Sequence, residues 1–204
     1  MLPRGEIARY LGYQGAALEP PVEALAARCE QALFSQCRPR RGARKVLISE
    51  LPFLGDSADL RRHLQDCTAA FLFALTLGGE ADRLLRQWSV ENMAKAAVGQ
   101  ACAAAWMDTL CDEYIDELEE ALPEGAHFAP PFSPGYGDFS LRWQPEVLRL
   151  LEARRLGISL SAAGMLLPQK SMTAVLGIGP HGGANCRTGC AACKKADCAF
   201  RKGV

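Results

Sequence analysis

Four cysteines lie close together near the C-terminal end of the sequence. Cys186, Cys190, Cys193 and Cys198 follow the spacing C-x3-C-x2-C-x4-C. Thiolates at such short spacing are typical ligands of tetrahedral zinc or of an iron–sulfur cluster. Nearby basic residues such as Lys194 favour the thiolate form. We therefore predict that residues 181–204 form a cysteine-rich metal- or cluster-binding tail, with a tail of free thiols as the alternative.

The first three of these cysteines also fit the C-x3-C-x2-C triplet of radical S-adenosylmethionine enzymes. In those enzymes the triplet lies early in a (β/α) barrel. Here only six residues follow Cys198, so the sequence disfavours that class. His181 is a further candidate ligand beside the tail cysteines.

The bulk composition indicates an intracellular globular protein. The 23 basic and 23 acidic residues cancel, which gives no electrostatic reason to expect a nucleic-acid or anionic-membrane partner. No apolar run reaches the ~20 residues of a membrane-spanning helix, and the first residues lack the apolar stretch of a secretory signal. We therefore expect a cytoplasmic location, where disulfides are rare. The remaining five cysteines lie in or beside apolar segments and are predicted to pack in the core: Cys29, Cys37, Cys67, Cys102 and Cys111.

Basic residues cluster at Arg38, Arg40, Arg41, Arg44 and Lys45. The first interpretation is a solvated segment before a strand. The alternative is a docking patch for an acidic partner or for the phosphate of a cofactor.

The apolar periodicity indicates helices and strands in one domain over residues 1–180. Helices are expected at 3–11, from 20 onward, and at 57–64, 81–88, 89–122 and 145–156. Strands are expected at 44–51, 67–77, 158–167 and 171–178. The last two are predicted to form a hairpin through Pro168, Gln169 and Lys170. Because helices outnumber strands and the last strands adjoin, the pattern predicts an α+β fold.

A rigid loop precedes the last predicted helix. In the segment Ser133-Pro134-Gly135-Tyr136, proline fixes one backbone angle, glycine permits positive φ, and tyrosine adds an aromatic ring with a polar end. Such a loop can offer backbone donors to a small ligand. On these residues alone, an ordinary structured turn is favoured over a ligand-binding loop.

The order of segments resembles the activation domain of cobalamin-dependent methionine synthase. The Pro-Gly-Tyr loop, a helix over 144–156, and a strand that begins at Pro168 follow one another as in that family. The stretch 75–85 and the cysteine-rich tail resemble free-standing members. The resemblance implies a curved single domain with a mainly antiparallel sheet flanked by helices.

The resemblance also implies a function in methionine biosynthesis. The family domain binds S-adenosylmethionine and docks over the cobalamin of its partner, while a flavoprotein supplies an electron and the sulfonium donates a methyl group. Residue by residue, it implies that a loop and a strand start line the S-adenosylmethionine site: Ser133, Pro134, Gly135, Tyr136, Pro168, Lys170, Ser171 and Thr173.

Two positions depart from the family pattern. Pro131 stands where the family has an arginine, and Ala162 stands where it has a glutamate. An arginine there is expected to pair with the ligand carboxylate. Arg142 and Lys170 are the nearby basic residues that could take its place.

Three functions follow from these observations. The first is an accessory protein that reactivates a methionine synthase or a related corrinoid methyltransferase, with S-adenosylmethionine as methyl donor. The second is a corrinoid- or metal-handling binding protein that has lost S-adenosylmethionine binding. The third is an enzyme that transfers electrons through its cysteine tail.

Overall fold

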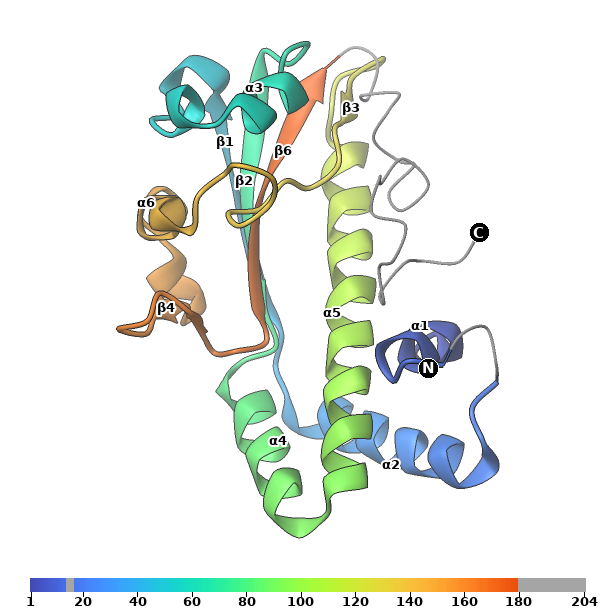
Figure 1. Ribbon diagram of the computed structural model, residues 1–204. Coiled ribbons are helices and arrows are strands. Elements are labelled where there is room, and N and C mark those ends of the chain that lie inside the picture. Colours follow the sequence, from blue (N-terminus) through green and yellow to red (C-terminus); the bar gives the residue numbers. More distant parts are fainter. Residues whose placement is uncertain (14–16, 180–204) are drawn as a thin grey trace.

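A computed structural model describes residues 1–13 and 17–179 (Figure 1). The helices are α1 (Arg4–Tyr10), α2 (Pro20–Gln36), α3 (Ala58–His63), α4 (Gly79–Glu91), α5 (Met93–Glu120) and α6 (Gln144–Leu150). The strands are β1 (Arg40–Leu47), β2 (Ala69–Thr76), β3 (His127–Phe128), β4 (Ser159–Leu160), β5 (Leu166–Leu167) and β6 (Ser171–Gly179). Four short 3-10 turns lie at Ile48–Glu50, Leu54–Asp56, Leu141–Trp143 and Ala153–Leu156.

The main sheet has the strand order β1-β2-β6-β3, and every neighbouring pair is antiparallel. Strand β2 lies in the middle and is buried along almost its whole length. A central strand covered on both faces needs apolar side chains at successive positions. This explains the unbroken apolar run from Ala69 to Leu75 and confirms the strand predicted there.

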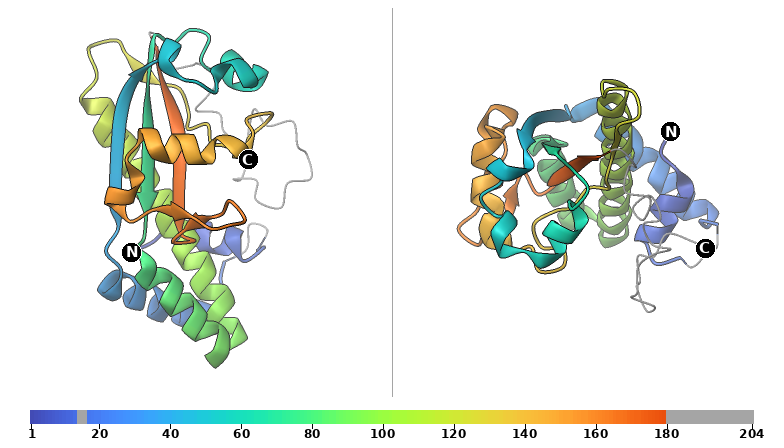
Figure 2. Two further views of the ribbon diagram at one scale, coloured as in Figure 1. Left: turned by 90° about the vertical axis from the view of Figure 1, so that its left-hand side faces the viewer. Right: turned by 90° about the horizontal axis from the view of Figure 1, so that it is seen from above.

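Long helices cover one face of this sheet. Viewed from above, the sheet lies between α6 on one side and α5 with α1 on the other (Figure 2). Phe73, Leu75 and Leu176 point into the core beneath α5. The buried residues of this helix include the small residues Gly99, Ala101, Cys102, Ala103 and Ala105, and small side chains let a helix approach its neighbours closely. At Gly99 a Cβ atom would lie 2.3 Å from the ring of Trp88 in α4.

Short helices and loops cover the other face. Leu72 and Val175 pack there against Phe53, Phe139 and Val147, all of which are buried. Lower on the same face, α6 and the turn after it form a small apolar cluster. The molecule is therefore an α+β domain with an antiparallel sheet flanked by helices, as predicted.

Four of the five core cysteines are buried: Cys29, Cys37, Cys102 and Cys111. Cys67 is half-buried. Burial raises the pKa of the Cys37 thiol to about 11 and that of Cys102 to about 12, because a desolvated thiolate is disfavoured. Packing as the role of the four buried cysteines is confirmed.

The predicted hairpin between 158–167 and 171–178 is wrong. The first segment folds on itself, so that Ser159 pairs with Leu167, and β6 pairs instead with β2. The turn is closed at Gly164, whose φ of +77° is favourable only for glycine, and the Ser161 carbonyl accepts its amide at 3.0 Å.

Two further boundaries differ from the predictions. The helix expected over 145–156 ends at Leu150, and Glu152 adopts a left-handed conformation with φ 50° before the 3-10 turn. Strand β1 begins at Arg40, so most of the basic cluster lies within the strand rather than before it. None of the described helices is long and apolar enough to cross a membrane.

Candidate functional site

The Pro-Gly-Tyr loop is fixed by its own backbone. The amide of Gly135 donates to the carbonyl of Phe139 at 2.7 Å, and the amide of Tyr136 donates to the carbonyl of Ser133 at 3.0 Å. Gly135 has φ +98°, which a residue with a side chain rarely adopts. Pro134 is buried, whereas 56 % of Tyr136 is exposed to solvent. The loop thus presents its aromatic ring outward from a rigid base.

Backbone hydrogen bonds hold this loop against β6. Phe132 and Val175 exchange both of their backbone hydrogen bonds, at 3.0 and 2.9 Å. The ring of Phe132 contacts the ring of Tyr136, with centroids 5.9 Å apart. The loop and the last strand therefore lie side by side.

A carboxylate anchors the far end of the loop to α3. Asp138 accepts hydrogen bonds from the Ser57 hydroxyl and from the amides of Ala58 at 2.8 Å and Asp59 at 3.1 Å. These bonds, led by the one from Ser57, lower the pKa of Asp138 because they stabilise its charged form. The Asp138 amide in turn donates to the Asp59 carboxylate at 3.2 Å.

The second group of predicted residues lies at the start of β6. The Ser171 hydroxyl donates to Thr76 at 2.8 Å or to the Pro168 carbonyl at 2.7 Å. The carbonyl of Lys170 accepts the amide of Leu77 at 2.9 Å. These bonds tie the strand start to the end of β2, just before α4.

The side chain of Lys170 is half-buried in this group. Burial lowers the pKa of its ammonium, and the carboxylate of Asp82 opposes the shift in part. That carboxylate is already bound to the amide of Gln169 at 2.9 Å. A bound anion would raise the pKa of Lys170, since an opposite charge favours the ammonium form.

Along β6, Thr173 lies between the residues at the strand start and the part of the strand that bonds to the loop. It is buried, and its hydroxyl accepts a hydrogen bond from the Gln144 amide at 2.7 Å. Val175, which holds the loop, is two residues further along the same face. Within the described chain, no hydrogen bond joins residues 133–136 directly to residues 168–171.

The two positions that depart from the family pattern lie on different elements. Pro131 is half-buried beside the bridge to β6, and Ala162 is exposed in the turn between β4 and β5. Arg142 pairs with Asp56 at 2.5 Å. Of the two basic residues considered as substitutes, Lys170 is therefore the one whose charge is left for a ligand.

Sequence reasoning missed three polar residues of this region: Thr76, Asp82 and Gln144. Thr76 ends an apolar strand and Gln144 begins a short helix. Neither position carries a local signal, because their partners Ser171 and Thr173 are far away in the sequence.

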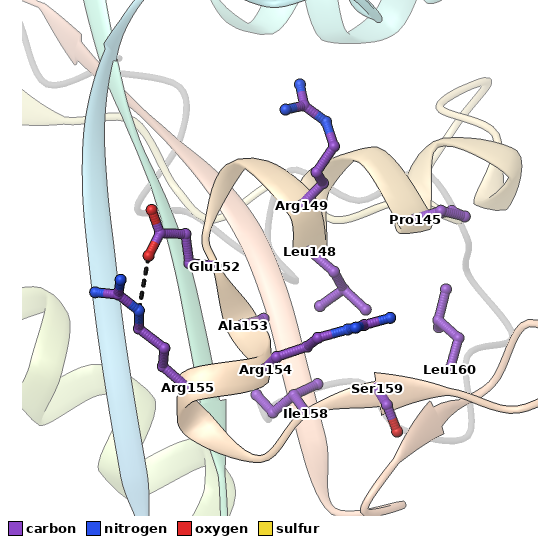
Figure 3. A pocket seen from close by; sticks show the side chains of 10 residues that line it. All are labelled: Pro145, Leu148, Arg149, Glu152, Ala153, Arg154, Arg155, Ile158, Ser159 and Leu160. Carbon is purple, nitrogen blue, oxygen red and sulfur yellow. Dashed lines mark ion pairs between the residues drawn. The ribbon is translucent and has the colours of Figure 1, made fainter.

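A cavity of about 580 Å³ lies between α6 and β4 (Figure 3). None of the predicted site residues lines it. Its lining is Pro145, Leu148, Arg149, Glu152, Ala153, Arg154, Arg155, Ile158, Ser159 and Leu160.

The predicted metal ligands Cys186, Cys190, Cys193 and Cys198 lie outside the described residues, as does the domain boundary at residue 180. Among residues 1–13 and 17–179, no group of three or more His, Cys, Asp or Glu side chains is placed to hold a metal ion.

Comparison with known proteins identifies the fold. No family model matches the chain, and no curated protein matches it. Among solved structures, the chain is similar to the MetH reactivation domain bound to AdoHcy, with a TM-score of 0.50 and 14 % sequence identity. The likeness covers 88 % of this chain and 78 % of that domain. The chain therefore has the fold of the MetH reactivation domain, as the order of its sequence segments predicted.

Proposed function

We propose that this protein is an accessory factor for the reductive reactivation of a cobalamin-dependent methionine synthase or a related corrinoid methyltransferase. The observation that carries the proposal is the likeness to the AdoHcy-bound reactivation domain over 88 % of the chain. The Pro-Gly-Tyr loop lies beside the last strand of this fold, where the sequence resemblance expects a ligand.

The ligand in this proposal is S-adenosylmethionine, of which AdoHcy is the demethylated form. Tyr136 is exposed and can cover an adenosyl group. Lys170 can pair with the ligand carboxylate in place of the arginine that Pro131 replaces. In this proposal the ligand meets one cation and one aromatic ring, fewer groups than the family pattern offers.

The proposed reaction takes place on the cofactor of a partner. The partner's cobalamin, once reduced by one electron from a flavoprotein, would supply the nucleophile that takes the methyl group of the sulfonium, and AdoHcy would be the leaving group. This chain would bind the methyl donor, orient it and exclude water. The cysteine tail belongs to the proposal as a zinc or iron–sulfur site, which metal analysis and a visible spectrum after anaerobic purification would test.

Calorimetric titration with S-adenosylmethionine tests the binding step. We expect measurable heat at millimolar ligand, and Pro131→Arg should strengthen binding about tenfold by adding a charged hydrogen bond. Pro123→Arg is the matched control, because Pro123 is exposed in the turn after α5. Absence of heat with both the natural chain and Pro131→Arg would reject the methyl-donor role.

A second candidate function is a corrinoid- or metal-handling binding protein that has lost S-adenosylmethionine. Pro131 and Ala162, which remove two charged groups, favour it. Capture of a corrinoid methyltransferase from cell extract is expected for both functions. Recovery of that enzyme's activity only when S-adenosylmethionine is added supports the first function alone.

A further inference from the structure

We infer that the cavity between α6 and β4 binds a small organic anion, a carboxylate or phosphate ester with an apolar body. This binding site is separate from the loop and strand residues of the proposed S-adenosylmethionine site. The ligand of this cavity would be bound in addition to any ligand of the proposed S-adenosylmethionine site.

The floor of the cavity is apolar. Leu148 and Ile158 form it and are themselves almost completely buried, with 8 % and 1 % of their surfaces exposed. Ala153 and Leu160 complete the floor (Figure 3). A volume of about 580 Å³ falls in the range of known small-molecule sites. An apolar body of the size of one aromatic ring would therefore bury its surface there.

The rim of the cavity carries unbalanced positive charge. Arg149 pairs with Glu146 through two hydrogen bonds of 2.7 and 2.6 Å, and Arg155 pairs with Glu152 at 2.8 Å. The guanidinium of Arg154 has no hydrogen-bond or ion-pair partner in the described part of the chain, whereas its backbone carbonyl accepts the amide of Gly157. Its side chain lies across the cavity, above Ile158 (Figure 3). Arg154 is thus the group that an anion would meet.

The strained turn after α6 creates this arrangement. Glu152 has φ 50°, a left-handed conformation that is unfavourable for a residue other than glycine. It ends the helix and turns the chain back, so that Arg154 and Ile158 face Leu148 across the cavity. Strain of this kind is maintained by surrounding structure and often lies at binding sites.

Strand β1 adds positive charge behind the turn. The guanidinium of Arg40 packs so close to Gly157 that a Cβ atom there would lie 2.9 Å from its nitrogen. Arg44 donates to the carbonyl of Leu150 at 2.9 Å. Two residues of the basic cluster noted in the sequence, Arg40 and Arg44, therefore lie beside the turn that borders the cavity, whereas Arg41 pairs with Glu117 of α5. Positive potential from several sources attracts an anion and also disfavours a cationic ligand.

The combination of a positively charged rim and an apolar floor favours organic anions. A guanidinium fork matches the oxygens of a carboxylate or a phosphate, and the apolar floor gains from burying a hydrocarbon group. An inorganic ion has no hydrocarbon group to place against that floor. Phenyl phosphate and benzoate are the simplest probes that contain both parts.

Nuclear magnetic resonance titration of the full chain tests the inference. We expect phenyl phosphate or benzoate to shift the signals of Leu148 and Ile158, and the tighter probe identifies the preferred head group. Inorganic phosphate and benzylamine, which each lack one part, should bind at least tenfold more weakly. Arg154→Gln should weaken the better probe about tenfold, while Arg155→Gln, whose arginine is already paired, should change its affinity less than threefold.

Two results would overturn the inference: equal binding of phenyl phosphate and inorganic phosphate, or unchanged affinity in Arg154→Gln. The same variant should bind S-adenosylmethionine as the natural chain does. A loss of both ligands together, with an unchanged circular dichroism spectrum, would mean that the two sites are one and would also reject the inference.

Discussion

Thr173 and Gln144 form a buried hydrogen bond of 2.7 Å between β6 and α6. Replacing one partner leaves the other unsatisfied in the interior, which costs about 1–3 kcal/mol. We expect Thr173→Val to lower the free energy of unfolding by that amount, measured by urea denaturation. Thr68→Val removes the same hydroxyl at an exposed position and should change stability little. Equal effects of the two substitutions on the free energy of unfolding would show that the hydrogen bond contributes nothing to stability.

Glu30 in α2 is the most buried acid described. It accepts hydrogen bonds from the Leu2 amide at 2.7 Å and from Arg4 at 2.6 Å. Burial acts to raise the pKa of Glu30, but these two donors outweigh it, and the net pKa is lowered. A carboxyl with a lowered pKa stabilises the fold above its ordinary pKa, and this contribution is lost as the pH falls through the lowered value.

We therefore expect Glu30→Gln to destabilise the protein near neutral pH by about 3 kcal/mol, as when one partner of a buried pair is removed. The difference from the natural chain should shrink as the pH falls below the ordinary carboxyl pKa. Thermal unfolding of both proteins between neutral and acidic pH measures it. A difference that stays constant over this range would contradict the role of the charge.

At the scale of elements, the close contact between α4 and α5 depends on glycine, which has no side chain, at position 99 of α5. A Cβ atom at Gly99 would lie 2.3 Å from Trp88, so Gly99→Ala must shift the indole ring or the helix. We expect a loss of about 1–3 kcal/mol from overpacking, although alanine is the better helix former by about 1 kcal/mol. In α1, a Cβ atom added at Gly5 would meet no neighbouring atom within 4 Å, and Gly5→Ala should not destabilise. Chemical denaturation of the two variants gives the comparison.

The elements themselves were largely predictable, and their pairing was less so. Pro20 and Pro21 mark the start of α2, and apolar spacing marks most of α5. The hairpin prediction failed because a short strand has no local signal for its partner. The apolar side chains of β6 fit β2 as well as they fit the segment before Pro168. The turn at Gly164 lay inside what the apolar pattern indicated as one continuous strand.

The candidate site was also predictable only in part, because local sequence carries no signal for partners that are distant in the chain. The family resemblance expected the Pro-Gly-Tyr loop and the last strand to be neighbours, and Phe132 and Val175 do bond to each other. The polar partner Gln144 was missed, because a single glutamine at a helix start carries no sign of a distant threonine. The strained Glu152 and the cavity beside it had no sequence signal either, since left-handed backbone usually coincides with glycine or asparagine.

At the scale of the whole molecule, the buried cysteines report on global unfolding. Their raised pKa values, about 11 for Cys37 and about 12 for Cys102, keep them as unreactive thiols near neutral pH. We expect iodoacetamide to modify Cys29, Cys37 and Cys102 only after denaturation, as followed by peptide mass spectrometry. Rapid modification of any of them in the native protein would mean that α2 or α5 opens locally.

The bridge between Phe132 and Val175 uses only main-chain atoms. Because these hydrogen bonds use no side-chain atoms, they can form whichever side chains the surrounding residues carry. Substitutions of side chains in the loop can therefore change what the loop offers to a small molecule without moving its backbone relative to the sheet.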